Sequence, residues 1–384
     1  MCSVLERLRV SPPLPSPAAP SKVQSVVAVP VADQPERPIQ QARGLSRPTS
    51  ADLFDWLFSG TLAHPSGGVA GWRERRTGRL SDEYPEISGY YLSAAVFAGM
   101  TSSAAVTRAA DWLCARIEAD ASASRRVDGS AIYNFDQGII AAGLIKYGVR
   151  AANARAVAAG IRAASRLRDQ VNELGYLPPL DPTAGPPHGR PATWSTVGRL
   201  HLAKTAQCLL LAAELGVAGM REAALIIIDD VSSAFSLASD GLRDEAGRIN
   251  LHATCYALEG IWIWNAAHRT TGLDEILHSA FDELLSHRLP SGGFPRLAAN
   301  AASGEQSDVH SQVVRLGALL GCASTVRPSI ARLRQVASPA GYGWSVPYEP
   351  QAAEVHENAW ATMFAAQALA LVDGPAELDW WELI

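Results

Sequence analysis

Groups able to transfer protons recur in the sequence as pairs at helical spacing. Glu86 and Tyr90 are four residues apart, and so are His252 and Tyr256. Residues at i and i+4 share one face of a helix. Each pair would therefore present an acid or base and a phenol to the same substrate, which suits general acid/base catalysis. Asp136, near the start of another apolar stretch, adds a second carboxylate, and these five residues are our catalytic candidates.

A second set of residues has the chemistry to bind a substrate. Histidine, glutamate and arginine could hydrogen bond to it, and indole rings could stack on a sugar ring. The candidates are Trp72, Arg73, Trp194, His201, His310, Trp344, Glu357 and Trp360. Structural roles compete with this interpretation, because aromatic rings anchor loops and a lone histidine in an apolar helix is often a core residue. Asp136, Asp308 and Asn250 could equally be helix caps.

The elements that would position these residues are helices of two kinds. Stretches with Arg and Glu on one side predict helices with one wet face, at residues 52–58, 104–119, 153–171, 221–237, 274–288 and 328–336. Stretches that are apolar almost all round predict buried helices, at residues 86–97, 136–147, 197–215, 250–267, 308–320 and 358–371. The two kinds alternate. A long loop leads from each amphipathic helix to the next apolar one, and a short link leads onward.

This alternation predicts an all-α fold of six helical hairpins, with the amphipathic helices outside and the apolar helices inside. If the inner helices close into a ring, the fold is an (α/α)6 toroid, whereas an open α-solenoid fits the same pattern. Inner helices of a toroid all point the same way, so residues near their starts converge on one mouth. We therefore expect one cavity to be lined by Glu86, Tyr90, Asp136, His201, His252, Tyr256, His310 and Glu357.

Composition narrows the possible classes of protein. The chain has 384 residues, of which 48% are hydrophobic and 18% charged, so it can bury a large core and is not a disordered chain. A formal net charge of −5 disfavours nucleic-acid binding, which usually needs a basic face. No apolar run approaches the roughly 18 residues of a membrane-spanning helix. The five scattered cysteines form no CxxC pair and are expected to be free thiols.

Residues 1–48 are rich in proline and lack the apolar stretch of a signal peptide. We expect them to form a disordered tail on a cytoplasmic protein, followed by a single domain at residues 49–384. The chain has no GxGxxG or P-loop motif, and none of its cysteines adjoins a histidine. We therefore expect no cofactor and no metal. The sequence leaves the oligomeric state open.

Four segments resemble those of bacterial (α/α)6-toroid proteins encoded near carbohydrate biosynthesis genes. Tyr84 to Tyr90, YPEISGY, is similar to a YPE-[TI]-[TS]-GY segment, and Phe135 to Gly138, FDQG, resembles a shortened FDxGQ segment with its last two residues exchanged. His252 to Gly260 resembles an HxxAYxxxG segment, and Asn358 to Phe364 resembles a closing N-[TW]-A element. The resemblance covers residues 50–372. The fold is shared by glucuronyl C5-epimerases, unsaturated glucuronyl hydrolases and polysaccharide lyases. The resemblance implies acid/base roles for Glu86, Tyr90, Asp136, His252 and Tyr256.

These observations lead to the hypothesis of a cofactor-independent, carbohydrate-active enzyme in a biosynthetic pathway, acting on a small-molecule or glycan substrate. Epimerisation, β-elimination and hydrolysis each need an acid and a base, and the sequence does not choose among them. Two alternatives stay open. One is a cyclase or rearrangement enzyme acting on a non-sugar substrate. A cavity lined mostly by Trp and Phe, with a single acid, would favour this alternative. The other is a non-catalytic toroid that binds a glycan or a partner.

Overall fold

The computed structural model describes residues 47–120, 131–184, 193–235, 248–298, 303–341, 343–352, 355–374 and 378–384. The tail predicted at residues 1–48 lies outside the described residues except for its last two positions. Thr49 caps the first helix of the described residues. Its side chain accepts a hydrogen bond from the backbone N–H of Asp52, whose carboxylate accepts one from the backbone N–H of Thr49.

An outer ring contains the amphipathic helices. These are α2 (Ser50–Phe58), α4 (Ala104–Asp120), α6 (Ala154–Leu174), α9 (Met220–Phe235), α11 (Leu273–Ser286) and α13 (Arg327–Val336). In α6, buried Ala156, Ala159, Ala163, Leu167 and Val171 recur at intervals of three and four residues. This spacing forms one apolar stripe facing the inner ring and leaves the charged side chains in water. The predicted outer helices are confirmed.

The inner ring contains the apolar helices. They are α3 (Pro85–Phe97), α5 (Asn134–Arg150), α8 (Ala206–Glu214) with its preceding 3₁₀ turn η2 (Leu200–Thr205), α10 (Leu251–His268), α12 (Ser307–Leu319) and α14 (Ala359–Asp373). Residues 134–148 of α5 are buried without a break. Helices packed on every side need no polar face, which explains the lack of amphipathic patterning in their sequences.

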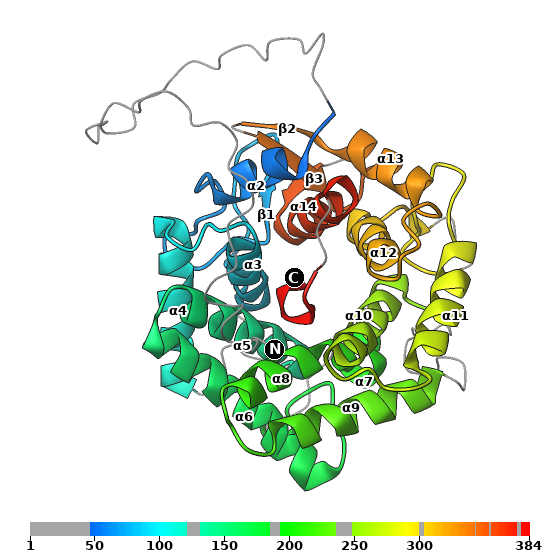
Figure 1. Ribbon diagram of the computed structural model, residues 1–384. Helices are drawn as coiled ribbons and strands as arrows, with labels where there is room; N and C mark the ends of the chain where they lie inside the picture. The colour runs from blue at the N-terminus through cyan, green and yellow to red at the C-terminus, as the bar shows by residue number, and fades with distance from the viewer. Residues whose placement is uncertain are drawn as a thin grey trace.

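The ring closes through contacts between the two ends of the domain. Helix α14, the last inner helix, packs against α3, the first (Figure 1). Helix α2, the first outer helix, covers α14 from outside, so the sixth helical pair combines the start of the domain with its end. The prediction of an all-α (α/α)6 toroid is confirmed, and the open solenoid is excluded.

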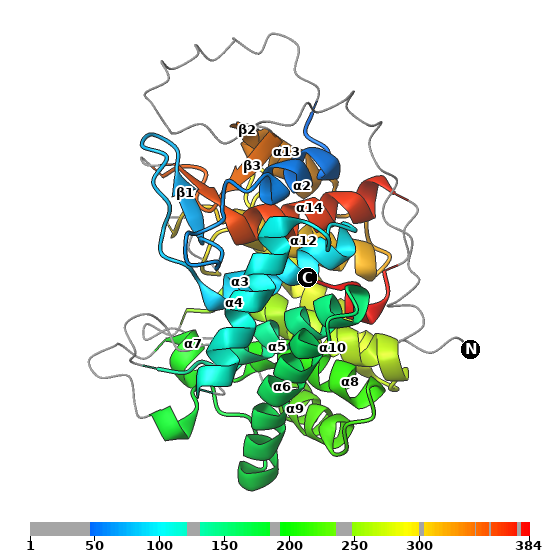
Figure 2. The same cartoon turned by 90° about the vertical axis from the view of Figure 1, so that its left-hand side faces the viewer.

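A small antiparallel sheet, which the sequence patterns did not reveal, fastens this closure. Strand β1 (Trp72–Glu74) comes from the first long loop, whereas β2 (Ser338–Ala340), β3 (Gly343–Pro347) and β4 (His356–Asn358) come from the last. The strand order is β1-β4-β3-β2, with Arg73 opposite Glu357. Figure 2 shows the strands gathered beside α2 and α13. Because three of its four strands have only three residues, the sheet is too short for its alternation to be visible in the sequence.

Neighbouring inner helices approach each other closely at glycines. A Cβ atom added to Gly143 of α5 would lie 2.2 Å from the backbone oxygen of Gly89 in α3. One added to Gly260 of α10 would lie 2.2 Å from the backbone carbon of Ala203 in η2. No side chain fits at such distances, so these glycines set how tightly the inner ring packs.

Replacing Gly143 by alanine is expected to lower the free energy of unfolding by about 1–3 kcal/mol, because the new methyl group forces α3 and α5 apart. Urea denaturation followed by circular dichroism measures the change. Gly71→Ala is the matched control, since a Cβ atom there meets nothing closer than 3.5 Å. Equal stabilities of the two variants would contradict the close crossing of α3 and α5.

The centre of the ring is filled by the last residues of the chain and by buried charges. Figure 1 places the end of the chain in the middle of the ring. The Lys204 ammonium donates to Glu259 at 2.5 Å and to the backbone oxygen of Ile384 at 2.6 Å, and Arg315 Nε donates to Glu259 at 3.1 Å. All three charged side chains are fully buried. This layer forms a floor across the ring.

None of the helices in the described residues is both long and apolar enough to cross a membrane.

Candidate functional site

A pocket of about 220 Å³ opens at the N-terminal ends of the inner helices. Every inner helix contributes a side chain to its wall. The contributing residues are Glu86 from α3, Asp136 from α5, His201 from η2, His252 and Tyr256 from α10, Asp308 from α12 and Trp360 from α14. Loops add Tyr84, Tyr133 and Tyr348, and the short helix α7 (Trp194–Val197) adds Trp194 and Ser195. Residues far apart in the sequence meet here because parallel inner helices bring their first turns to one end of the ring.

His252 is held in a defined orientation. Its Nδ1 atom lies 2.6 Å from Gln312 Oε1 and 3.3 Å from Asp308 Oδ2. Both neighbours are acceptors, so Nδ1 carries the proton and Nε2 is left as the basic nitrogen. The side chain keeps 12% of its surface exposed. His252 is therefore positioned to accept a proton from a molecule in the pocket.

Asp308 belongs to the site, although its place at the start of α12 also fits a capping role. It is fully buried, and it interacts with both His252 and the Trp360 indole N–H. Burial raises the pKa of its carboxyl group, and the positive charge of a protonated His252 opposes that rise. Asp308 and Gln312 are four residues apart on one helix face, and this spacing is the signal by which the sequence could have revealed both partners of His252.

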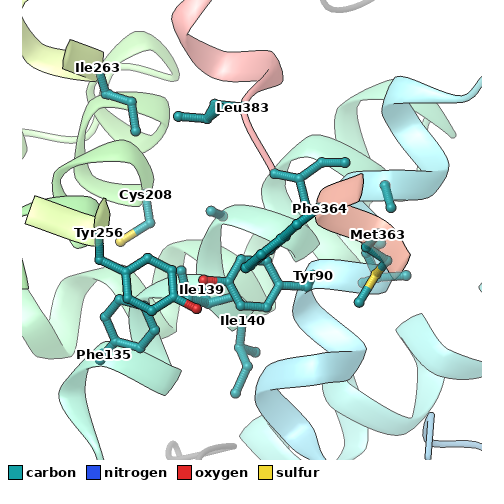
Figure 3. Packing of buried hydrophobic residues seen from close by; sticks show 14 of the residues in the cluster. Tyr90, Phe135, Ile139, Ile140, Cys208, Tyr256, Ile263, Met363, Phe364 and Leu383 are labelled. Atoms are coloured by element: carbon teal, nitrogen blue, oxygen red, sulfur yellow. The ribbon is translucent and has the colours of Figure 1, made fainter. Parts of the chain in front are cut away.

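The two candidate tyrosines lie at the bottom of the site. Tyr256 lines the pocket, with its ring 4.3 Å from that of His252 and 4.6 Å from that of Phe135. Tyr90 lies behind the pocket lining, and Figure 3 shows the two hydroxyl oxygens pointing toward one another. Burial raises the pKa of both phenols well above its ordinary value. Both therefore stay neutral near pH 7 and can donate a hydrogen bond but not act as a phenolate base.

His201 is an uncharged member of the pocket wall. It is 1% exposed, and its Nδ1 atom has no hydrogen-bond partner among the described residues. Burial, assisted by the nearby His252, lowers its pKa to about 3. The Trp194 ring stands edge-on to it, with ring centres 5.0 Å apart. His201 can thus exchange hydrogen bonds with a ligand but supplies no positive charge.

Glu86 and Asp136 occupy the first turns of adjacent inner helices. Pro85 begins α3 at a position where proline suits a helix and leaves Glu86 in the first turn. Acidic side chains in first turns are stabilised by the helix dipole. Asp136 is 4% exposed, whereas Glu86 is half-buried. The pocket thus has two carboxylates in different environments on one side and the His252–Asp308 pair on another.

Several predicted residues lie outside this pocket. Glu357 is 3% exposed and accepts a hydrogen bond from Arg73 Nη1 at 3.0 Å across the sheet. Trp72 stacks on His356 within the same sheet, and Trp344 is on β3. These four residues reinforce the ring closure.

His310 also lies outside the pocket, although it is on α12 like Asp308. It is fully buried, its Nε2 atom is 3.3 Å from the backbone oxygen of Phe294, and it interacts electrostatically with Glu305. His310 precedes Gln312 by two residues, which places it on the other side of the helix. Of the eight residues expected to line one cavity, five do: Glu86, Asp136, His201, His252 and Tyr256.

A larger cavity, of about 740 Å³, lies at the other end of the ring, among the C-terminal ends of α10, α12 and α14. Its wall combines Trp262, Arg269, Asp274, His278 and Trp380. One acidic first turn reaches it, that of α11, through Asp274. Within the described residues, no group of three or more His, Cys, Asp or Glu side chains is arranged to hold a metal ion at either end.

Acidification is expected to destabilise the fold through two buried histidines. The pKa of His201 is about 3 and that of His310 about 4, both lowered by burial from 6.5. As the pH falls below 6.5, the unfolded chain binds two protons that the folded chain rejects, so stability is lost progressively toward pH 4. The loss approaches about 1.4 kcal/mol per pH unit for each imidazole.

Urea denaturation at a series of pH values measures this effect. The His201→Gln variant should show a shallower decline between pH 6.5 and pH 4. His278→Gln, an exposed position on α11, is the control and should keep the decline of the unaltered protein. A decline that is unchanged in His201→Gln would mean that His201 is not buried as an uncharged group.

Comparisons with known proteins identify the fold. A scan against protein-family models found no match, and a search of curated proteins found none either. Among solved structures, the unsaturated glucuronyl hydrolase from Bacillus sp. GL1 superposes with a TM-score of 0.66 at 10% identity, covering 87% of this chain and 99% of that one. An unsaturated glucuronyl hydrolase specific for heparin gives 0.63 at 8% identity, covering 84% and 95%.

A third structure is a variant of the Streptococcus agalactiae unsaturated glucuronyl hydrolase in complex with dGlcA-GalNAc6S. Its TM-score is 0.61 at 10% identity, and the match covers 86% of this chain and 92% of that one. The chain therefore has the toroid fold of the unsaturated glucuronyl hydrolases over most of its length, as the sequence motifs indicated. Identities this low establish the fold and leave the chemistry to be argued from the pocket itself.

Proposed function

We propose that this protein is a carbohydrate-active enzyme that works by general acid/base catalysis in the mouth of the toroid, without a cofactor. One observation carries the proposal: the first two turns of five of the six inner helices bring two histidines, three carboxylates and a neutral phenol into one pocket. Burying polar groups costs about 1–3 kcal/mol for each one left unpaired. A core serving only stability would have no reason to gather so many at one level.

The size and walls of the pocket support a sugar as the substrate. A volume of about 220 Å³ is smaller than the roughly 300–1,000 Å³ typical of drug-sized ligands, and it suits a single sugar ring. Trp194, Tyr348 and Trp360 offer aromatic faces for stacking, and carboxylates and imidazoles can hydrogen bond to hydroxyl groups. The solved neighbours include a glycan complex, which is consistent with this use of the fold.

In this mechanism His252 Nε2 is the base, because Gln312 and Asp308 keep the proton on Nδ1. Asp136 or Glu86 supplies the acid, and Tyr256 donates a hydrogen bond to charge that develops on oxygen. The pocket holds three carboxylates rather than the single acid among Trp and Phe side chains expected for a cyclase of non-sugar substrates. The proposal includes the biosynthetic setting implied by the sequence resemblance and the cytoplasmic location expected from the N-terminal sequence.

A panel of glycosides tests the proposal with three readouts. Release of a sugar reports hydrolysis, exchange of ring hydrogen for solvent deuterium reports epimerisation, and new ultraviolet absorbance from a carbon–carbon double bond reports elimination. The full-length protein should turn over at least one glycoside, and His252→Ala should not. Binding of glycosides without turnover would indicate the non-catalytic toroid. Failure of every glycoside to bind would overturn the proposal.

A further inference from the structure

The cavity of about 740 Å³ at the other end of the ring, here called the far cavity, is separate from the pocket at the mouth. Among the described residues, none lines both. Helix α10 connects them, with His252 at the mouth and Arg269 at the far end, roughly 25 Å away along the helix axis. Glu259, part of the floor of buried charges, lies between them on the same helix. A molecule in the far cavity is therefore a second ligand and not an extension of one in the mouth.

The wall of the far cavity is held in place by the ring itself. It combines the ends of α10, α12 and α14 with the start of α11 and with residues 378–380. Trp380 is 5% exposed, and its backbone oxygen accepts a hydrogen bond from Gln207 Nε2 at 2.9 Å. Trp262 on α10 adds a second, half-buried indole. The far cavity is thus a preformed site with two aromatic rings in its wall, a common composition for small-molecule sites.

One buried polar atom in this wall calls for a hydrogen-bond donor. Asn265 lines the far cavity, is 6% exposed and donates from Nδ2 to Asp274 Oδ1 at 2.7 Å. This hydrogen bond fixes the orientation of the amide, so that its oxygen faces away from Asp274 as an acceptor. Asn265 Oδ1 accepts no hydrogen bond from any described residue. Because unsatisfied buried acceptors are rare in native proteins, a ligand with hydroxyl groups accounts for this one.

Arg269 has a backbone conformation that arginine rarely adopts. It ends α10 with a φ of 54° and a ψ of 52°, in the left-handed region where glycine is the usual residue. Its side chain lines the far cavity. The guanidinium carries several N–H donors in a fixed planar arrangement. A strained backbone at a ligand site indicates that the side chain serves the ligand, since glycine would end the helix at lower cost.

These walls match a short chain of sugars. Indoles pack against the apolar faces of sugar rings, and the guanidinium of Arg269 and the carboxylate of Asp274 can each engage two neighbouring hydroxyl groups. The far cavity has more than three times the volume of the pocket at the mouth, which suits a single ring. We propose that it is a second, non-catalytic site that binds an oligosaccharide of about three sugar rings. This site goes beyond the proposed function and does not depend on catalysis in the mouth.

Trisaccharide binding by the full-length protein, measured by isothermal titration calorimetry, tests the second site. The probes are maltotriose, cellotriose, triacetylchitotriose and trigalacturonate, which differ in linkage, substituents and charge. At least one should bind saturably. Trp262→Ala should weaken that binding by about tenfold or more, as expected for loss of an indole that stacks on a sugar ring. Trp194→Ala removes a half-buried indole from the mouth instead and is the matched control, so it should not weaken the same binding.

Arg269→Gly separates binding from stability. Glycine adopts the left-handed conformation without strain, so the midpoint of urea denaturation should stay the same or rise. Trisaccharide binding should nevertheless weaken by about fivefold or more, because the guanidinium donors are lost. Ala152→Gly is the matched control. Ala152 follows α5 with a φ of 52°, and it is not among the residues that line the far cavity, so its replacement should leave binding unchanged.

The contrary outcomes are distinct from failure of the proposed function. Binding that is lost in Trp194→Ala and kept in Trp262→Ala would place the oligosaccharide in the mouth and overturn the second site. Equal losses in both variants, or binding of none of the four trisaccharides, would also overturn it. In each case the turnover of glycosides in the mouth would still decide the proposed function. Unchanged binding by Arg269→Gly, with a lower urea midpoint, would show that Arg269 serves the end of the helix and not a ligand.

Discussion

Replacing His252 by alanine is expected to lower kcat by roughly 10²–10⁴-fold, the usual contribution of a positioned general base. The imidazole is partly exposed in the pocket and packs edge-on against Trp194 and Tyr256. Its removal leaves the helix intact, so the melting temperature should fall by no more than about 2–4 °C, the shift that about 1 kcal/mol produces in a large domain. Initial rates and differential scanning fluorimetry measure the two effects separately.

Gln312 provides the matched test of how His252 is oriented. Gln312→Leu keeps the imidazole but removes the acceptor at 2.6 Å from Nδ1, so kcat should fall less than in His252→Ala. Gln312→Glu places a negative charge there, which favours the imidazolium over the free base. Since the base must be deprotonated, the acidic limb of the kcat/KM profile should move to higher pH. An unshifted limb would argue that His252 is not the base, and a normal rate in His252→Ala would exclude it.

Replacing Glu259 by leucine is expected to cost about 3–5 kcal/mol of stability, the usual effect of removing one partner from a buried ion pair. Glu259 is fully buried and is the carboxylate that accepts from both Lys204 and Arg315. Although burial opposes ionisation, Arg315 and Lys204 hold the pKa of Glu259 below its ordinary value. Without Glu259 two buried cations would face each other at the centre of the ring.

The triple variant Glu259→Leu, Lys204→Met and Arg315→Met separates lost charge pairing from lost packing. Replacing a whole buried ionic group by apolar side chains of similar volume is often neutral or stabilising. Urea denaturation should therefore show the triple variant to be more stable than Glu259→Leu alone. If the triple variant is destabilised as much as Glu259→Leu, charge balance is not what the three residues contribute to stability. They would then stabilise the fold through packing and through the hydrogen bond from Lys204 to Ile384.

The location of the pocket was largely predictable, because helix periodicity and residue order carry that information. Apolar residues all round a helix identify an inner helix, and an amphipathic face identifies an outer one. Once two rings of helices are inferred, residues such as Glu86, Asp136 and His252 must lie at the same end, since they occupy the first turns of parallel helices. This reasoning needs no knowledge of contacts between distant residues.

Which of several similar residues enter the pocket could not be predicted in this way. Asn250 and Asp308 are both polar residues near the start of an inner helix, yet Asn250 caps α10 by accepting from the backbone N–H of Ala253, whereas Asp308, in the first turn of α12, interacts with His252. The rotation of each inner helix about its axis decides this, and that rotation depends on packing against both neighbours. Glycines such as Gly143 set this packing where two backbones meet. The sequence pattern of a single helix does not show it.

The sequence by itself determined the helix types, their alternation and the end of the ring at which acids and bases gather, because each follows from local periodicity and chain order. Only the tertiary structure decided that α2 covers α14, that Arg73 pairs with Glu357 and that Lys204, Glu259 and Arg315 form the floor. Arg73 and Glu357 are 284 positions apart. A buried charge requires a partner of opposite charge. The free-energy cost of removing that charge from water does not depend on which residue is the partner. Only the assembled ring determines which one lies within reach.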